Sequence, residues 1–349
     1  MASRRGCSGK SQARARMRAY HDDVGWLADL AGYAGLDREE LRDLLGCFFA
    51  DRAAAEIPDW AKDREDPAFE ARRETLCRAH GWSASMPLCK LVHYELMARE
   101  SYKVALHVEW LEALEILRAP GAPLQVLDYG CGVGSFGNLA LSFDEVRCTL
   151  ADMDPKLVHY LAWKHRDLPE RLRVQRLEGD CALPPRAARV PVDSRSISGR
   201  YDAIALADVL EHTIDPFRIL RQLLARIRPG GIVFVNYPKE IEGDWHTPEA
   251  FHLRRGCFLL LRLCARRVRP HTWRMRSHRW RRIVLRVARA ANPALYRGAA
   301  RFARAYFERH GRELAEIVRT RAHRELSLED LLASVVEWPC GDVGGSGVD

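Results

Sequence analysis

The chain has 349 residues, of which 47% are hydrophobic and 29% are charged, and this globular composition excludes a disordered or fibrous protein. A prior of roughly 150 residues per domain predicts about two domains, or one large domain with additions. The net charge of +8 is uneven, because residues 251–307 contain 16 Arg, no Lys and no acidic residue, so that the rest of the chain carries −8.

The N-terminal segment, residues 1–20, contains six basic residues and no acid, and it lacks the apolar core of a secretory signal. We interpret it as a disordered basic arm, with a mitochondrial transit peptide as the alternative. The ten Cys lack framework spacing, which indicates reduced thiols, and no apolar run approaches the about 20 residues of a membrane-spanning helix. These features favour a cytoplasmic protein, either free or peripherally attached to a membrane.

Residues 21–118 have the patterns of a helical N-terminal region. A capping box at Asp37 and Glu40 precedes one apolar run, and a second helical pattern covers residues 88–117. Four residues of this region have metal-ligand side chains at short spacing, namely Cys77, His80, Cys89 and His93. We interpret them as buried neutral side chains of helices, with a zinc site as the alternative, and we assign no metal site to the chain.

Between residues 124 and 240, short apolar stretches alternate with helical patterns. The five candidate strands are Leu124–Asp128, Val146–Ala151, Leu172–Leu177, Tyr201–Ala207 and Gly231–Asn236. This alternation predicts an α/β fold, with a Rossmann-like, doubly wound and mostly parallel sheet. Ligands of such sheets bind at the carboxyl ends of the strands.

Beyond residue 240 the strand pattern fades. Residues 241–340 have the pattern of Arg-rich helices interrupted at Pro270 and Pro293, and we interpret them as a basic helical addition that serves as a lid or acceptor-binding region. Residues 341–349 have the composition of a flexible tail.

A glycine-rich loop follows the first candidate strand. Gly130, Gly132 and Gly134 alternate along the chain just after Asp128, and glycines allow the backbone to approach a ligand closely. Together with Gly137 they also fit a dinucleotide fingerprint, so the glycines alone leave a dinucleotide-binding oxidoreductase open.

Acidic residues follow four successive strands, at Asp128, Asp152, Asp180 and Asp208. Asp128 would face a pyrophosphate badly, but it would suit a cationic amine. Asp152 has the position that typically binds ribose hydroxyls, and Asp180 could accept from an adenine amino group. This row of acids therefore favours a ligand with ammonium, ribose and adenine groups and no phosphate.

In these residues the sequence resembles the class I S-adenosylmethionine-dependent methyltransferases, over roughly Leu124–Pro238. The motifs that carry the resemblance are Asp128-x-Gly-x-Gly-x-Gly134, Asp152, Gly179-Asp180, Tyr201-Asp202, Asp208-Val-Leu-Glu-His212, Asp215-Pro216 and Arg228-Pro-Gly-Gly231. The Val-Leu-Glu-His element and the Pro-Gly-Gly turn look most like the branch of the ubiquinone-biosynthesis O-methyltransferases.

The resemblance implies S-adenosyl-L-methionine as the cofactor, with its methionine end on the glycine loop, its ribose on Asp152 and its adenine near Asp180. The expected cofactor-binding residues are Asp128, Gly130, Cys131, Gly132, Gly134, Asp152, Met153, Asp180, Cys181 and Asp208. Within this set, Met153 is expected to pack on the adenine face, and the two cysteines fill space beside the cofactor. Two further acids have structural interpretations, Asp154 as a helix N-cap and Asp202 as a residue that caps or pairs locally near the start of its strand.

The expected chemistry is methyl transfer to a small-molecule acceptor, most simply at oxygen. A hydroxyl acceptor requires a base, and His212 follows the fourth strand at the edge where ligands bind. Glu211 is a candidate to orient this histidine or to bind the acceptor or a metal, and His246 is a candidate for the acceptor pocket. An alternative for His212 is a packing role at the start of a helix.

The chain departs from the resembled family after Pro238, because the last two antiparallel strands of that family are not visible in the sequence. A basic block replaces or interrupts them, and three kinds of partner fit its charge. It could bind an anionic acceptor, it could lie on a membrane through residues 258–282, or it could bind nucleic acid. The last option corresponds to an RNA methyltransferase, and a non-catalytic cofactor-binding scaffold is a further alternative.

Overall fold

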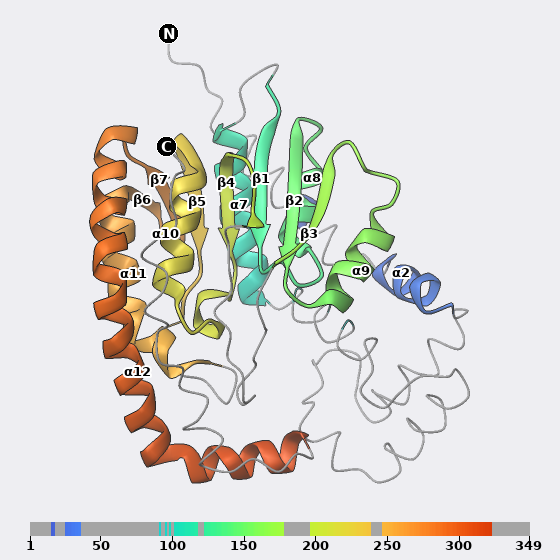
Figure 1. Cartoon of the computed structure of the whole chain (residues 1–349). Coiled ribbons are helices and arrows are strands. Elements are labelled where there is room, and N and C mark those ends of the chain that lie inside the picture. The colour runs from blue at the N-terminus through green and yellow to red at the C-terminus, as the bar shows by residue number, and fades with distance from the viewer. Residues whose placement is uncertain are drawn as a thin grey trace. The chain divides into compact units, whose positions relative to one another are not determined.

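The computed structural model describes residues 15–17, 25–35, 91, 95, 98, 101–117, 122–177, 196–238 and 246–322 (Figure 1). The chain divides into two compact units, Met1–Arg176 and Leu177–Asp349. Several sequence predictions lie outside the described residues: the capping box at Asp37, the cysteines and histidines at 77, 80, 89 and 93, the pair Asp180 and Cys181, and the tail 341–349.

The α/β part of the first unit contains three parallel strands. They are β1 (Leu124–Tyr129), β2 (Val146–Asp152) and β3 (Leu172–Arg176), in the spatial order β3-β2-β1. Helix α8 (Ser135–Leu141) connects β1 to β2, and α9 (Pro155–Lys164) connects β2 to β3. Strands β1 and β2 are apolar along most of their length because a parallel strand covered by helices is buried on both faces.

Helices precede these strands in the first unit, namely α2 (Gly25–Ala34) and α7 (Ser101–Leu117). Helix α7 packs on α8, where Trp110 meets the ring of Phe136 edge-on at 5.2 Å between centroids. The prediction of helices in residues 21–118 is confirmed for these two described segments.

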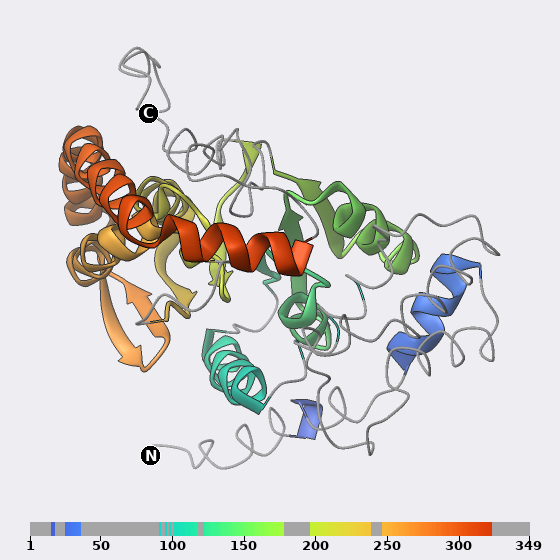
Figure 2. The ribbon, with the colours of Figure 1, turned by 90° about the horizontal axis from the view of Figure 1, so that it is seen from below.

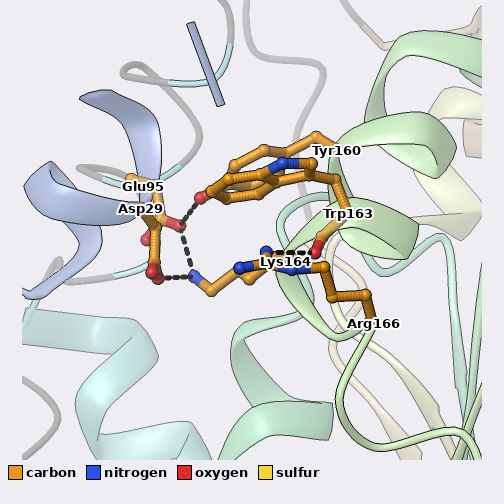
Figure 3. Close-up of polar contacts among 6 residues, drawn as sticks. All are labelled: Asp29, Glu95, Tyr160, Trp163, Lys164 and Arg166. Atoms are coloured by element: carbon orange, nitrogen blue, oxygen red, sulfur yellow. Dashed lines mark hydrogen bonds and ion pairs between the residues drawn. The ribbon is translucent and has the colours of Figure 1, made fainter. Parts of the chain in front are cut away.

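A partly buried ion-pair network joins Asp29 of α2 and Glu95 to Lys164 of α9. Figure 3 shows Asp29 and Glu95 converging on the Lys164 ammonium, at 3.3 and 3.1 Å. The Tyr160 hydroxyl also donates to Glu95, at 3.3 Å, and Arg166 lies over the Trp163 ring at 4.7 Å. Because Glu95 is fully buried, it requires these donors, and they hold the helical region on α9.

The second unit begins with two parallel strands, β4 (Tyr201–Leu206) and β5 (Ile227–Val235). The short helix η2 (Leu210–His212) and α10 (Pro216–Arg226) connect them. Helices α11 (Pro248–Cys264) and α12 (His278–Ala322) follow, and α12 lies beside α10 and α11 in both ribbon views (Figure 1, Figure 2). Strands joined by helices in both units confirm the prediction of a Rossmann-like α/β fold with a mostly parallel sheet.

The prediction that the Arg-rich region consists of interrupted helices without strands is wrong at residues 265–275. Strands β6 (Ala265–Arg269) and β7 (Thr272–Met275) form an antiparallel hairpin there, and β7 also pairs with β5, so the spatial order is β4-β5-β7-β6. Strand β6 has no apolar pattern in the sequence because its arginines are exposed. On β7, in contrast, Trp273 is buried beside its partner Val233. Pairing with a distant strand, rather than local apolar content, therefore decides this segment.

The predicted interruption of the helices at Pro270 is confirmed, whereas the predicted interruption at Pro293 is wrong. Pro270 lies in the hairpin turn, and Pro293 lies inside α12 without ending that helix. Next to this proline, Asn292 connects α12 to the N-cap residue of α10, because its side-chain amide donates to Asp215 at 3.1 Å. None of the helices in the described ranges is long and apolar enough to cross a membrane.

Candidate functional site

The glycine loop between β1 and α8 turns through left-handed backbone. Gly130, Gly132 and Gly134 have φ angles of 68°, 56° and 74°, a conformation that side chains with a Cβ rarely adopt. The amides of Gly130 and Cys131 both donate to the carbonyl of Ala151, at 2.7 and 3.2 Å. The loop is thereby fastened to the carboxyl end of β2.

Asp128, at the end of β1, forms a hydrogen bond to the first turn of α8. Its side chain is 3% exposed, and its Oδ2 accepts from the backbone amide of Gly137 at 2.9 Å. The N-cap residue of α8 is Gly134, which has no capping side chain, so the strand carboxylate satisfies one of the helix's first amides instead. A Cβ on Gly137 would lie 2.2 Å from Cδ2 of Leu150, which explains why a glycine occupies this position.

Asp152 joins the loop to the end of β2. Its Oδ2 accepts from the amide of Gly132 and its Oδ1 from the amide of Asp154, both at 2.9 Å. Asp154 itself caps α9 by accepting from the amide of Lys156, as predicted, and Met153 between the two acids is half-buried. The two predicted cofactor acids of this unit therefore both shape the loop.

Burial makes this region electrostatically favourable for a cation. Desolvation raises the pKa of Asp128 to about 7, and the nearby charge of Asp152 adds to this, while the Gly137 amide and Lys103 oppose it. Desolvation also raises the pKa of Asp152, and it raises the pKa of the Cys131 thiol well above its usual value. Two carboxyl groups with little compensating charge gain from a positively charged ligand.

Asp208 lies at the carboxyl end of β4 in the second unit. Its φ of 51° makes it the only non-glycine residue with left-handed backbone in the described part of the chain. The amide group of Asn236, which follows the neighbouring parallel strand β5, donates to the Asp208 carboxylate. Backbone strain of this kind concentrates at functional sites, and the binding role of Asp208 stays a prediction.

Thr247, in the segment between β5 and α11, connects this segment to the short helix η2 that follows β4. Its amide donates to the carbonyl of Glu211 and its hydroxyl to the carbonyl of Thr213, both at 2.8 Å. The same hydroxyl caps α11 by accepting from the amide of Ala250. Because Thr247 is fully buried, this arrangement fixes the position of the preceding residue, His246.

Three titratable side chains meet as a result, and we call Glu211, His212 and His246 the Glu-His-His cluster. One nitrogen or oxygen atom from each lies within 4.8 Å of the others. The two imidazole centroids are 5.2 Å apart, and the Glu211 side chain is only 1% exposed. All three residues are candidates from the sequence, Glu211 and His212 for catalysis and His246 for the acceptor pocket. The hydrogen bonds of Thr247 bring His246 to the other two.

This cluster offers two kinds of chemistry. An imidazole beside a buried carboxylate can accept a proton near neutral pH, because the carboxylate stabilises the imidazolium. Two histidines and one carboxylate are also a donor set from which proteins build sites for divalent metals. The sequence raises Glu211 as a candidate metal ligand, but it assigns no metal site to the three residues together.

Comparisons with known proteins identify the family of the chain. Residues 101–289, more than half of the chain, match the family model described as "Methyltransferase domain". A ubiquinone biosynthesis O-methyltransferase of Xanthomonas campestris pv. campestris (strain B100) is 30% identical over 134 residues, which is 38% of this chain and 48% of that protein. One from Azotobacter vinelandii (strain DJ / ATCC BAA-1303) is 28% identical over 129 residues, which is 37% of this chain and 49% of that protein.

The chain spans about half the length of these curated relatives. Among solved structures, the CurJ carbon methyltransferase has a TM-score of 0.36 and 17% sequence identity, covering 80% of this chain and 63% of its own.

The chain belongs to the methyltransferase-domain family, within the class I S-adenosylmethionine-dependent methyltransferases. Its cofactor is S-adenosyl-L-methionine, and the first unit fits this cofactor. A left-handed glycine loop beside two buried carboxyl groups, Asp128 and Asp152, suits a cationic ligand without phosphate. The individual contacts of these residues with the methionine and ribose groups remain predictions.

Proposed function

We propose that this protein transfers a methyl group to a hydroxyl oxygen of a small-molecule acceptor, with His212 as the base. The observation that carries the proposal is the Glu-His-His cluster, which follows β4 and β5 at their carboxyl ends, where ligands of parallel sheets bind. The names of the curated relatives, ubiquinone biosynthesis O-methyltransferases, also support oxygen as the acceptor atom.

S-adenosylmethionine, when bound, supplies a methyl group already activated by a sulfonium. The residues of this chain then have two tasks, to hold the reactants in position in a water-poor site and to take the hydroxyl proton. An imidazole nitrogen of His212 would accept that proton as the oxygen takes the methyl group, while the methyl–sulfur bond would break with its electron pair left on the sulfur of a neutral thioether. The Glu211 carboxylate stabilises the resulting imidazolium, and His246 lies close enough to orient the acceptor hydroxyl or pass the proton on.

The decisive experiment incubates the purified chain with a cofactor carrying a ¹³C-labelled methyl group and a fractionated cell extract. We expect label in a small-molecule fraction, with a methyl-carbon NMR shift characteristic of an ether. Label in RNA, or a shift characteristic of N-methyl or C-methyl, would overturn the proposal. Absence of transfer to any fraction, with cofactor binding intact, would indicate a cofactor-binding scaffold instead.

A second measurement separates the two chemistries of the cluster. A histidine acting as a base alone predicts that label transfer is unchanged after treatment with a chelator. Loss of transfer on chelation, with recovery on adding a divalent metal, would show that the cluster acts as a metal site and that the assignment of His212 as a free base is wrong.

A further inference from the structure

Helix α12 has an apolar face that is exposed as well as one that is buried. Its buried side packs on α10 and α11 and contains Val284, Ala288, Asn292, Tyr296, Ala299, Ala303 and Phe307. On the other side, Trp280, Ile283 and Val287 are 48%, 55% and 64% exposed. Their spacing of three and four residues places them in one row along the helix, and we call this row the apolar stripe.

A row of positive charges runs next to the apolar stripe. Arg279, Arg282 and Arg286 are exposed, and each precedes a stripe residue by one position, so the two rows are adjacent on the helix surface. No acidic residue occurs between Phe251 and Phe307 to compensate them. The surface therefore combines exposed apolar side chains with charge of a single sign.

The end of α11 continues this surface. The indole N–H of Trp280 donates to the carbonyl of Leu263 at 2.8 Å, which fixes the tryptophan against the last turn of α11. Leu263 and Leu259, one turn apart on α11, are 40% and 58% exposed. Two helices thus contribute to one exposed apolar surface next to the arginines.

We propose that this surface docks on a membrane with anionic headgroups. Trp280, Ile283 and Val287 would enter the boundary between headgroups and acyl chains, the position that amphipathic helices and tryptophan side chains favour. The three arginines would keep their guanidinium groups at the level of the lipid phosphates while their stems cover apolar surface. This attachment is peripheral, and it does not depend on the acceptor proposed above.

Charge and side-chain type favour lipid over other occupants. Nucleic acid would neutralise the arginines, but the aliphatic side chains Ile283 and Val287 lack the planar faces on which bases stack. A second copy of the chain could cover the apolar stripe, but it would bring two rows of arginines together without an intervening acid. An anionic membrane would bury the apolar stripe and would also neutralise the row of arginines.

The test is flotation of the full chain with vesicles of phosphatidylcholine alone and with vesicles containing about 30 mol% phosphatidylglycerol. We expect binding to the anionic vesicles only. The variant R279Q/R282Q/R286Q should bind about 100-fold more weakly, since each basic residue near such a surface contributes roughly fivefold. The variant W280S/I283S/V287S should bind at least about tenfold more weakly although its charge is unchanged.

A charge-matched control is R147Q/R173Q/R176Q, which removes the same three charges from exposed positions on β2 and β3. We expect it to bind within about threefold of the original protein, and circular dichroism with cofactor titration verifies that all three variants are folded. Anionic vesicles should also shift the tryptophan fluorescence to shorter wavelength, and the conservative variant W280F should lose most of this shift.

Three results would overturn the proposal. The first is equal binding by the apolar-stripe variant and the original protein, which would reduce the effect to charge alone. The second is RNA displacing the protein from vesicles while RNA binding does not require the apolar stripe. The third is a concentration-dependent dimer in sedimentation that the apolar-stripe variant abolishes, with no vesicle binding by the original protein.

Discussion

The glycine loop of the first unit and the Glu-His-His cluster of the second are built in different ways. In the loop, the carboxylates of Asp128 and Asp152 accept from backbone amides, so they determine the shape of the backbone. In the cluster, the hydrogen bonds of Thr247 fix the backbone. The side chains of Glu211, His212 and His246 lie near one another as a result.

This difference separates side chains that hold the backbone of the loop in place from side chains that are available for proton transfer. A carboxylate that holds a loop must stay in place, and burial with two backbone donors keeps Asp152 there. A group that exchanges a proton must titrate near neutral pH and be reachable by the acceptor. Changes in the loop should therefore alter cofactor affinity and stability, whereas changes in the cluster should alter turnover.

The largest expected effect is on turnover in His212→Gln. Removing a general base lowers kcat by about 10²–10⁴-fold, while cofactor affinity measured by calorimetry should stay unchanged. The control is His159→Gln, which changes an exposed histidine of α9 and should leave turnover unaltered. Normal turnover in His212→Gln would exclude this residue as the base. A loss of cofactor affinity as large as the loss of turnover would show that His212 contributes to cofactor binding instead.

The next largest effect is on cofactor binding in Asp152→Ala. The change leaves the amides of Gly132 and Asp154 without their acceptor, at about 1–3 kcal/mol for each buried donor, and it removes a carboxylate from the predicted cofactor site. We expect affinity to fall about 100-fold in calorimetry, with a lower melting temperature. Asp154→Ala removes only the cap of α9, which costs about 1 kcal/mol of stability, and should retain cofactor affinity; similar losses in the two variants would contradict a specific role for Asp152.

A smaller effect, on stability, is expected from Gly137→Ala. The new Cβ would overlap with Leu150, and overpacking of this kind costs about 1–3 kcal/mol of unfolding free energy. Shortening the neighbour in Leu150→Val should recover part of that loss in the double variant, as measured by chemical denaturation. Strictly additive effects would show that the two side chains do not compete for the same space.

The smallest effect is a pH dependence of cofactor binding. The raised pKa of Asp128, about 7, means that the folded protein favours the protonated carboxyl. Its contribution to stability is complete below its ordinary pKa, and it is lost as the pH rises through about 7. A cationic cofactor favours the ionised form, so we expect affinity to rise about eightfold from about pH 6 to about pH 7.5.

Calorimetry in two buffers of different ionisation enthalpy measures this proton release directly. The isosteric change Asp128→Asn should abolish both the pH dependence and the released proton. An affinity that is flat with pH in the original protein would indicate that Asp128 remains ionised in the free state, or does not sense the cofactor charge.

Local signals were sufficient to predict much of the fold and of the loop. All five predicted strands are present, from β1 through β5, because buried parallel strands are short apolar runs between helical patterns. The N-cap at Asp154 also follows from near neighbours in the chain. Asp202 does form an ion pair, with Arg228 at 2.7 Å, but this partner is 26 residues away on the neighbouring strand β5 and is not local as predicted. Local sequence could not show that Asp128 caps α8 through Gly137, because that bond depends on how the helix packs against the strand.

The sequence by itself determined the class of the protein, because the strand pattern, the spaced glycines and the acids after successive strands are read along a short stretch of chain. The tertiary structure decided the rest. It formed the β6–β7 hairpin through pairing with β5, and it brought His246 to Glu211 through Thr247. It also left the apolar stripe of α12 exposed while burying the opposite face. Each of these outcomes depends on contacts between residues distant in the chain, and such contacts leave no periodic signal in the residues that make them.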